Sequence, residues 1–400
     1  MNINPVILSI PIYFGLIVIE WTYDLIKKKG IYRLNDAFGN ISCGMFEQIT
    51  GVFLKVLTIG IYVFIYDNFK IATIPTTWPF IILMWLVVDF LYYWAHRWSH
   101  TINLFWLGHM VHHQSEDYNF SVALRQGALQ KVFTFWVYLP MAFLGFDPVW
   151  FVIIGALNTV YQFWIHTEQI NRMGWFGLVF NTPSHHRVHH ARNPKYIDKN
   201  HAGSLIIWDK MFGTFVAEEE TPVYGVTKPN GHWDPVSSHI QPFVDLFKDM
   251  QQIKKFGNKL AVLWMPPGWL PAENGGMRFP PEVDKSTYSK FTVKIDRTLS
   301  IYLFIHFLTV LGGTAFFLFN FTKLEITENL AFSGLLIFSV LSLGLLFESR
   351  KFAWMIEILR LLLLITLNTY LSQGPLSIGV DAILIISIAV IFKTRDTLYR

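Results

Sequence analysis

Histidine is the residue type in this chain with the clearest chemical pattern. The 400-residue sequence has 14 histidines, and eleven of them lie between His96 and His201. Residues three and four positions apart lie on one face of an α-helix. Eight of the histidines form three groups with this spacing: His96 and His100; His109, His112 and His113; His186, His189 and His190. Three helical turns that meet would therefore bring eight imidazoles together.

Such a set predicts a metal site. Neutral imidazole is the commonest metal ligand in proteins, and eight are too many for one ordinary ion, so we predict two metals. An all-nitrogen set suits iron, copper, nickel or zinc and argues against magnesium or calcium. The chain has no His-Glu-x-x-His motif of zinc hydrolases, which favours iron. Because the ligands are neutral, we expect carboxylates around them, and the candidates are Asp89, Glu116, Asp117 and Glu168.

The other histidines receive separate predictions. His166 ends an apolar helix on the same side as the three groups, so we predict it as a ninth ligand. His185 lies about 100° around the helix from His186 and should support the ligands rather than bind metal. For His201, a supporting position and a surface position both remain open. An alternative for the three groups is that their histidines reach lipid headgroups at the membrane interface. That role would not need the repeated helical spacing. Three more histidines are predicted to be structural: His232, His239 and His306.

The composition predicts that most of the chain lies in a membrane. Hydrophobic residues make up 52% and charged residues 15%, and the mean hydropathy is +0.37. A soluble protein has about 25% charged residues. The net charge of +4 is spread along the chain and indicates no nucleic-acid partner. The single cysteine, Cys43, excludes an internal disulfide and a thiolate metal cage.

Apolar runs predict where the chain crosses the bilayer, since a spanning helix needs about 20 apolar residues. Residues 131–166 are apolar but interrupted by Pro140 and Pro148, which predicts a helical hairpin that enters and leaves on one side. Residues 218–296 are polar and proline-rich and should lie outside the membrane. Spanning helices are expected at residues 4–23, 45–66, 78–94, 299–319, 330–347, 352–371 and 376–392.

This arrangement places most basic residues on the side of the histidines, which the positive-inside rule identifies as cytoplasmic. The residues concerned are Lys27, Lys28, Lys29, Arg33, Arg350, Lys351, Lys393, Arg395 and Arg400. We therefore predict an all-α, polytopic membrane protein with a cytoplasmic, histidine-rich cap and a C-terminal transmembrane bundle. Its expected parts are N-terminal anchor helices (1–77), a catalytic domain (78–216), a soluble proline-rich segment (217–296) and a four-helix bundle (297–400).

The three histidine groups, in this order, resemble the fatty acid hydroxylase and sterol desaturase superfamily of non-haem di-iron enzymes. The resemblance covers roughly residues 78–215. It implies two irons that activate O2 to hydroxylate or desaturate a lipid C–H bond.

Further motifs are similar to the alkylglycerol monooxygenase family within it. They lie at residues 93–97, 115–119, 123–126, 162–168 and 193–215. This resemblance implies tetrahydrobiopterin as reductant and hydroxylation of the ether-linked carbon of alkylglycerols, which releases a fatty aldehyde. The motifs contain our candidate catalytic residues, Glu116, Asp117 and Asn200. One departure is Thr101, where the family has a glutamate after the second histidine.

The chain has neither a Gly-x-Gly-x-x-Gly dinucleotide motif nor a fused cytochrome signature, so electrons must come from a pterin or a separate protein. The remaining partners are O2 and a lipid from the bilayer. Fatty acid, sterol or carotenoid hydroxylation or desaturation are the nearest alternatives. A non-enzymatic metal transporter would need polar residues along a path through the spans, whereas these histidines gather at helix ends. The segment 218–296 has two interpretations. It either covers the metal site and binds the reductant, or it is inert chain that only connects the catalytic domain to the C-terminal bundle.

Overall fold

A computed structural model describes residues 5–371 and 374–395 of the chain. Within these residues the regular structure is helical, with two isolated β-bridges, which confirms the predicted all-α class. The predicted helix start at Asn4 and the charge of Arg400 lie outside the described residues. The N-terminal half begins with α1 (Pro5–Lys27), α2 (Leu34–Phe69), α3 (Trp78–Thr101) and α4 (Asn103–His113).

Six helices in the described residues are long and apolar enough to cross a membrane. They are α1, α2, α3 and, in the C-terminal bundle, α14 (Arg297–Asn320), α15 (Ile326–Phe347) and α17 (Pro375–Thr394). The bundle is completed by α16 (Ala353–Leu371), so all four predicted C-terminal helices form. Helix α16 is not one of the six, and the membrane span predicted at residues 352–371 stays a prediction. Helix α2 is longer than the predicted run at 45–66, because its first turns carry buried polar residues that pack under the cap, among them Asp36 and Asn40.

The interrupted apolar stretch forms the predicted hairpin. Its first arm consists of α6 (Gln130–Thr134), η1 (Phe135–Tyr138) and α7 (Leu139–Leu144), and its second arm is α8 (Pro148–Phe163). Gly145, with φ of +95°, reverses the chain, and Asp147 caps α8 through the backbone N–H groups of Val149 and Trp150. The Ile74 N–H donates to the Gly145 carbonyl at 3.0 Å. The tip of the hairpin therefore lies beside the α2–α3 connection, at the far end of α3 from Thr101.

Helices packed around the Thr101 end of α3 form the cap: α5 (Phe120–Ala123), α10 (Pro183–His190), η2 (Pro194–Tyr196), α12 (Pro235–Gln252), α13 (Phe256–Trp264) and η3 (Ala272–Asn274). Two further short helices, α9 (Phe176–Val179) and α11 (Ile207–Met211), lie farther along α3, where Trp208 donates to Asp89. Leu107 of α4 packs with Leu246 of α12 and Val262 of α13. The polar segment after residue 217 is thus folded onto a helix that carries three of the clustered histidines.

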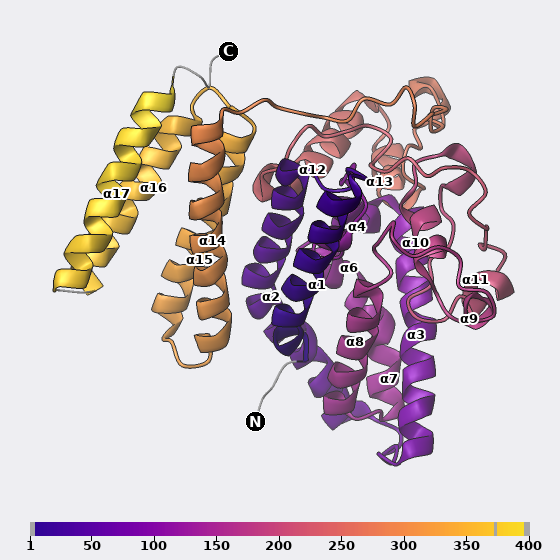
Figure 1. Cartoon of the computed structure of the whole chain (residues 1–400). Helices are drawn as coiled ribbons and strands as arrows, with labels where there is room; N and C mark the ends of the chain where they lie inside the picture. Colours follow the sequence, from indigo (N-terminus) through magenta and orange to yellow (C-terminus); the bar gives the residue numbers. More distant parts are fainter. Residues whose placement is uncertain (1–4, 372–373, 396–400) are drawn as a thin grey trace.

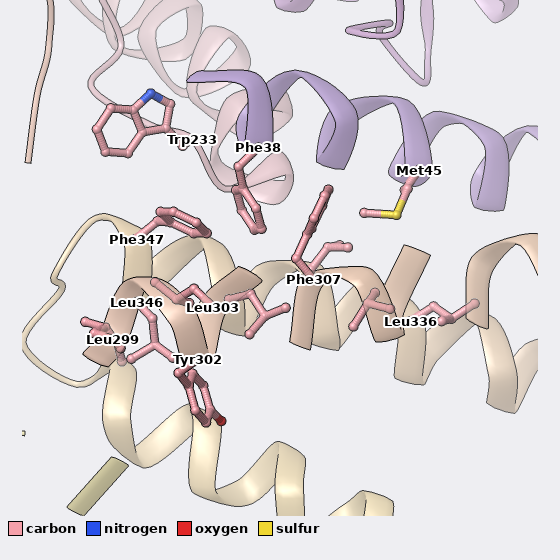
Figure 2. Close-up of a cluster of buried hydrophobic side chains, with 14 of the residues drawn as sticks. Phe38, Met45, Trp233, Leu299, Tyr302, Leu303, Phe307, Leu336, Leu346 and Phe347 are labelled. Carbon is pink, nitrogen blue, oxygen red and sulfur yellow. The ribbon is translucent and has the colours of Figure 1, made fainter. Parts of the chain in front are cut away.

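The largest apolar core joins the two halves of the molecule (Figure 2). Phe38 of α2 lies 4.7 Å, between ring centroids, from Phe307 of α14 and 4.1 Å from Phe347 of α15. Met45 and Trp233 extend the same core. The C-terminal bundle therefore packs directly on α2 rather than standing apart from the N-terminal helices.

Candidate metal centre

Nine buried histidines form two groups, each with ligand atoms within 4.8 Å of one another. The five-histidine group consists of His96, His100, His109, His113 and His189. The four-histidine group consists of His112, His166, His186 and His190. These are the eight clustered histidines of the sequence together with His166, the predicted ninth.

Four segments supply these side chains. The last two turns of α3 carry the first histidine pair, α4 and α10 each carry a trio, and His166 follows the end of α8. The break between α3 and α4 is one extended residue, Ile102 (φ −120°, ψ 119°). It turns α4 back so that its histidines face those of α3. Pro183 begins α10 at a position where the missing N–H costs no helical hydrogen bond.

The ring nitrogens meet at distances that fit metal ligation. His96 Nε2 lies 2.9 Å from His109 Nε2, and His113 Nε2 lies 3.1 Å from the same atom. His166 Nε2 lies 3.0 Å from His186 Nε2. Two imidazole nitrogens each about 2.1 Å from one metal, at a right angle, would lie about 3.0 Å apart. The spacing of the nitrogens is therefore that of neighbouring ligands on one ion.

The hydrogen bonds of the other ring nitrogens orient these ligands. In four histidines Nδ1 bonds a main-chain carbonyl, which leaves Nε2 for the metal. The pairs are His96 with His201 O (2.7 Å), His112 with Arg125 O (2.7 Å), His166 with Gln162 O (2.7 Å) and His189 with Lys199 O (3.0 Å). The buried Nε2 atoms of His100, His189 and His190 have no hydrogen-bond partner, as expected for atoms that bind a cation.

Burial keeps the imidazoles neutral. Desolvation, with neighbouring imidazoles as a further cause, holds the pKa of His109, His113, His189 and His190 well below the ordinary value. Desolvation lowers the pKa of His112 to about 4. Neutral imidazoles are the form that binds metal, so the electrostatics agree with the geometry.

The carboxylates predicted to surround the ligands bond elsewhere. Asp89 accepts the N–H groups of Ser204 (2.7 Å) and Leu205 (3.1 Å). Glu168 lies 3.8 Å from Lys285 Nζ. An acidic side chain that does approach a ligand is Asp198, 3.6 Å from His100 Nδ1. Asp198 lies in the chain segment after α10 and has a φ of +55°. No sequence pattern pointed to this residue.

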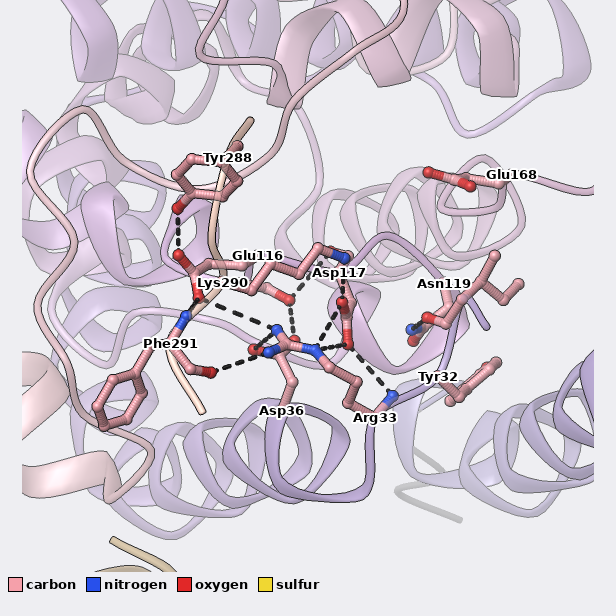
Figure 3. Close-up of polar contacts among 12 residues, drawn as sticks. Tyr32, Arg33, Asp36, Glu116, Asp117, Asn119, Glu168, Tyr288, Lys290 and Phe291 are labelled. Atoms are coloured by element: carbon pink, nitrogen blue, oxygen red, sulfur yellow. Dashed lines mark hydrogen bonds and ion pairs between the residues drawn. The ribbon is translucent and has the colours of Figure 1, made fainter. Parts of the chain in front are cut away.

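The candidate catalytic residues Glu116 and Asp117 belong to a polar network near the metal centre (Figure 3). The Tyr288 hydroxyl and the Phe291 N–H donate to Glu116. Arg33 Nε (3.0 Å) and Lys290 Nζ (2.6 Å) donate to Asp117. Desolvation and the nearby Asp36 raise the pKa of Asp117 to about 6. The network links the α1–α2 connection to the segment before α14.

The side chains of Asn200 and Thr101 form hydrogen bonds with main-chain groups. The Asn200 amide donates to the carbonyls of His185 (3.0 Å) and Val216 (2.8 Å), and its oxygen accepts the Val216 N–H (2.9 Å). These bonds fix the loop at Asn200. The next residue in this loop is His201, and its carbonyl orients His96. Thr101 donates to the Arg97 carbonyl within the end of α3 (3.0 Å).

The remaining histidines divide clearly. His185 stands outside both groups against Phe215, and His201 is fully buried with its ring centroid 5.1 Å from that of His100. The surface position left open for His201 is therefore excluded. The three histidines predicted to be structural bond other parts of the chain: His232 to Glu348 (3.2 Å), His239 to Pro235 O (2.6 Å) and His306 to Ser387 (3.1 Å).

Comparison with known proteins identifies the family. Residues 81–214 match the fatty acid hydroxylase family, and residues 299–380 match the alkylglycerol monooxygenase C-terminal domain. Alkylglycerol monooxygenase from Xenopus tropicalis is 38% identical over 364 residues, which cover 90% of this chain and 80% of that protein. The Homo sapiens protein of the same name is 36% identical over 370 residues, 92% of this chain and 83% of that protein. The chain belongs to the alkylglycerol monooxygenase family.

Membership of the alkylglycerol monooxygenase family makes the protein an oxidoreductase, a monooxygenase of lipids, and an integral multi-pass membrane protein. A third relative, from Danio rerio, is 35% identical over 373 residues, 92% of this chain and 82% of that protein. No solved structure matches this chain. The family and the nitrogen ligand set together agree with iron as the metal.

Proposed function

We propose that this protein oxidises the ether-linked carbon of alkylglycerols at a centre of two irons. The observation that carries the proposal is the pair of groups of five and four imidazoles at the end of a membrane-spanning helix. Iron in such sites supplies O2 activation and redox equivalents that side chains lack. The chain contributes nine buried histidines and orients four of their rings through main-chain carbonyls.

The depth of the site supports this substrate. The ether-linked carbon of an alkylglycerol is the first carbon of its alkyl chain, so in a bilayer it lies where hydrocarbon meets headgroups. His96 and His100 lie in the last two turns of α3, at the corresponding end of a spanning helix. Oxidation of fatty acids, sterols or carotenoids is the alternative within the superfamily.

The proposed reaction inserts one oxygen atom of O2 into the C–H bond beside the ether oxygen. The second oxygen atom leaves as water, with two electrons and two protons from a reductant. The product is a hemiacetal, whose C–O bond breaks to give a fatty aldehyde and a glycerol derivative. We take tetrahydrobiopterin as the reductant on the family resemblance; an electron-transfer protein is the alternative.

We also propose that the metal centre faces the cytoplasm. The basic residues between and after the spanning helices support this orientation, because they occupy the end of the molecule that carries the histidines. They include Lys27, Lys28 and Lys29 at the end of α1, Arg350 and Lys351 after α15, and Lys393 and Arg395 at the end of α17.

The test uses the iron-loaded protein in lipid nanodiscs with an alkylglycerol and O2. We expect fatty aldehyde when tetrahydrobiopterin is present and none when it is omitted. An acylglycerol of the same chain length serves as control, since it lacks the ether. Aldehyde formation that ignores the pterin but requires a ferredoxin or cytochrome would contradict the pterin proposal, and oxidation of a fatty acid or sterol in place of the alkylglycerol would contradict the substrate.

A further inference from the structure

A small lobe beside α3 exposes large apolar side chains. It consists of residues 174–181 and 204–212, which contain α9 and α11. An antiparallel bridge between Phe180 and Leu205 joins the two segments. The exposed fractions are 78% for Trp175, 64% for Leu178, 42% for Val179 and 67% for Met211. Several large apolar side chains exposed together indicate a contact surface.

The lobe is attached to α3 within the part of this helix that is long and apolar enough to cross a membrane. Asp89 accepts hydrogen bonds from the N–H groups of Ser204 and Leu205 and from Trp208 Nε1 (2.9 Å). A hydrocarbon core takes about 20 helical residues, which from Trp78 extend to Arg97. At a rise of about 1.5 Å per residue, Asp89 lies about 12 Å inside that boundary.

A second attachment joins the lobe to the apolar hairpin. Tyr161 of α8 donates to the Asn181 carbonyl (2.7 Å), and the Ser204 hydroxyl donates to Asn158 Oδ1 (2.8 Å). The inner face of the lobe thus fills the angle between α3 and α8. Figure 1 shows α9 and α11 beside α3, nearer its Trp78 end than α10 is. The outer face of the lobe points away from both helices.

Basic side chains border the apolar tip. Lys210 is exposed and donates to the Leu178 carbonyl (2.7 Å), and Arg172 is exposed just before the first segment. Apolar side chains that include tryptophan, bordered by Lys and Arg, are typical of segments that lie in a membrane interface. The lipid-facing surface of α3 continues onto the lobe, since Phe90 packs on Trp208.

We propose that this lobe is inserted into the lipid leaflet on the side of the metal centre. Trp175, Leu178, Val179 and Met211 then contact lipid, and the basic border meets anionic headgroups. Two hydrogen bonds connect the lobe to a predicted ligand. Asp209 accepts the His201 N–H (2.8 Å), and the His201 carbonyl orients His96. Lipid contact therefore supports the loop that positions a metal ligand.

A spin label measures this insertion. Cys43 is the only cysteine and is 0% exposed, so it does not compete with an introduced cysteine. We attach a nitroxide at Leu178→Cys, with Glu282→Cys, an exposed position in the polar segment, as control. The protein is placed in nanodiscs of phosphatidylcholine and phosphatidylglycerol. Collision rates are compared for O2, which concentrates in hydrocarbon, and for a water-soluble nickel chelate.

The label at position 178 should collide mainly with O2, and the label at position 282 mainly with the nickel chelate. Met211→Cys, on the other segment, should repeat the result and covers the case in which Leu178→Cys fails to fold. Equal behaviour at positions 178 and 282 would overturn the proposal. So would a label at 178 that is shielded from both reagents, because a second copy or another protein would then cover the face.

Discussion

Adjacent histidines in this chain belong to different groups. In each His-x-x-His-His trio the first and third histidines, four positions apart, join one group, and the middle histidine joins the other. The sequence predicted eight members of the set because helical spacing is a local property, and it predicted His166 from its place at the end of an apolar helix. It did not predict the division into five and four. Residues one position apart diverge by about 100° around a helix, and the packing of α3, α4 and α10 decides which group each one joins.

The neighbours His185 and His186 provide a matched pair of variants. His186→Ala removes one of four ligands and should abolish turnover and lower bound iron, while the protein still inserts into the membrane. His185→Ala should keep iron and most of the activity, because its side chain lies outside both groups. Iron per chain and product formation are measured for both. Retained turnover in His186→Ala would remove this residue from the ligand set.

The buried histidines predict an acid-sensitive iron-free protein. His112 has a pKa of about 4 in the folded chain, against about 6.5 when unfolded. Between these values the unfolded chain takes up protons that the folded chain does not. Stability is therefore complete above pH 6.5 and is lost as the pH falls, by up to about 1.4 kcal/mol per pH unit for each such histidine.

The thermal unfolding midpoint of the iron-free protein should accordingly fall between pH 7 and pH 5. Iron-loaded protein is the control, since bound metal competes with these protons and should hold the midpoint to lower pH. A midpoint that stays constant over this range without iron would contradict the assignment of buried, neutral imidazoles.

At the scale of elements, close backbone contacts position α4. A Cβ atom on Gly127 would lie 1.8 Å from the Gly108 carbonyl oxygen, and Gly108 itself lies against the backbone of Gln130. The start of the apolar hairpin therefore touches the helix that carries three ligands, and a larger residue at 127 would push them apart.

Gly127→Ala should displace α4 and lower bound iron several-fold. Gly155→Ala is the matched control, because nothing lies within 4 Å of a Cβ at that position on α8. It should leave iron content unchanged, since alanine is the better helix former by about 1 kcal/mol. Iron is counted in both purified proteins. Equal iron in the two variants would show that this contact does not set the position of α4.

Helices and the hairpin were predictable because apolar runs and prolines are local signals. The contacts of Asp117 were not, since its partners Arg33 and Lys290 lie 84 and 173 positions away. The sequence indicated acidic residues near the metals, but the ligands are oriented by main-chain carbonyls, such as that of Arg125 behind His112. Carbonyls are present at every position and leave no pattern to detect.

At the scale of the whole molecule, the C-terminal bundle is part of the core of the N-terminal half. Phe38, Met45 and Ile49 of α2 pack in the cluster that includes α14 and α15. A Cβ on Gly344 of α15 would lie 2.5 Å from Asp234 Cβ, so the bundle also touches the start of α12. We propose that the chain has four parts, residues 1–77, 78–216, 217–296 and 297–400. The first, third and fourth parts share this core, and residues 78–216, which the structure describes throughout, contribute no side chain to it.

Deletion of residues 297–400 should therefore destabilise the rest, by an amount on the order of several kcal/mol, because three large side chains lose their packing partners. The midpoint of thermal aggregation in detergent should fall, and co-expression of 297–400 as a separate chain should restore it. A truncated protein with undiminished stability and iron content would contradict the shared core.

If the nine histidines hold irons that oxidise an ether lipid with O2, the oxygen atom of the aldehyde comes from O2. The most direct test supplies ¹⁸O2 to the iron-loaded protein with an alkylglycerol and a reductant, and traps the aldehyde by reduction to the alcohol. We predict one ¹⁸O atom in the trapped alcohol and none with His186→Ala. Unlabelled product, or labelled product that forms equally with His186→Ala, would contradict the account.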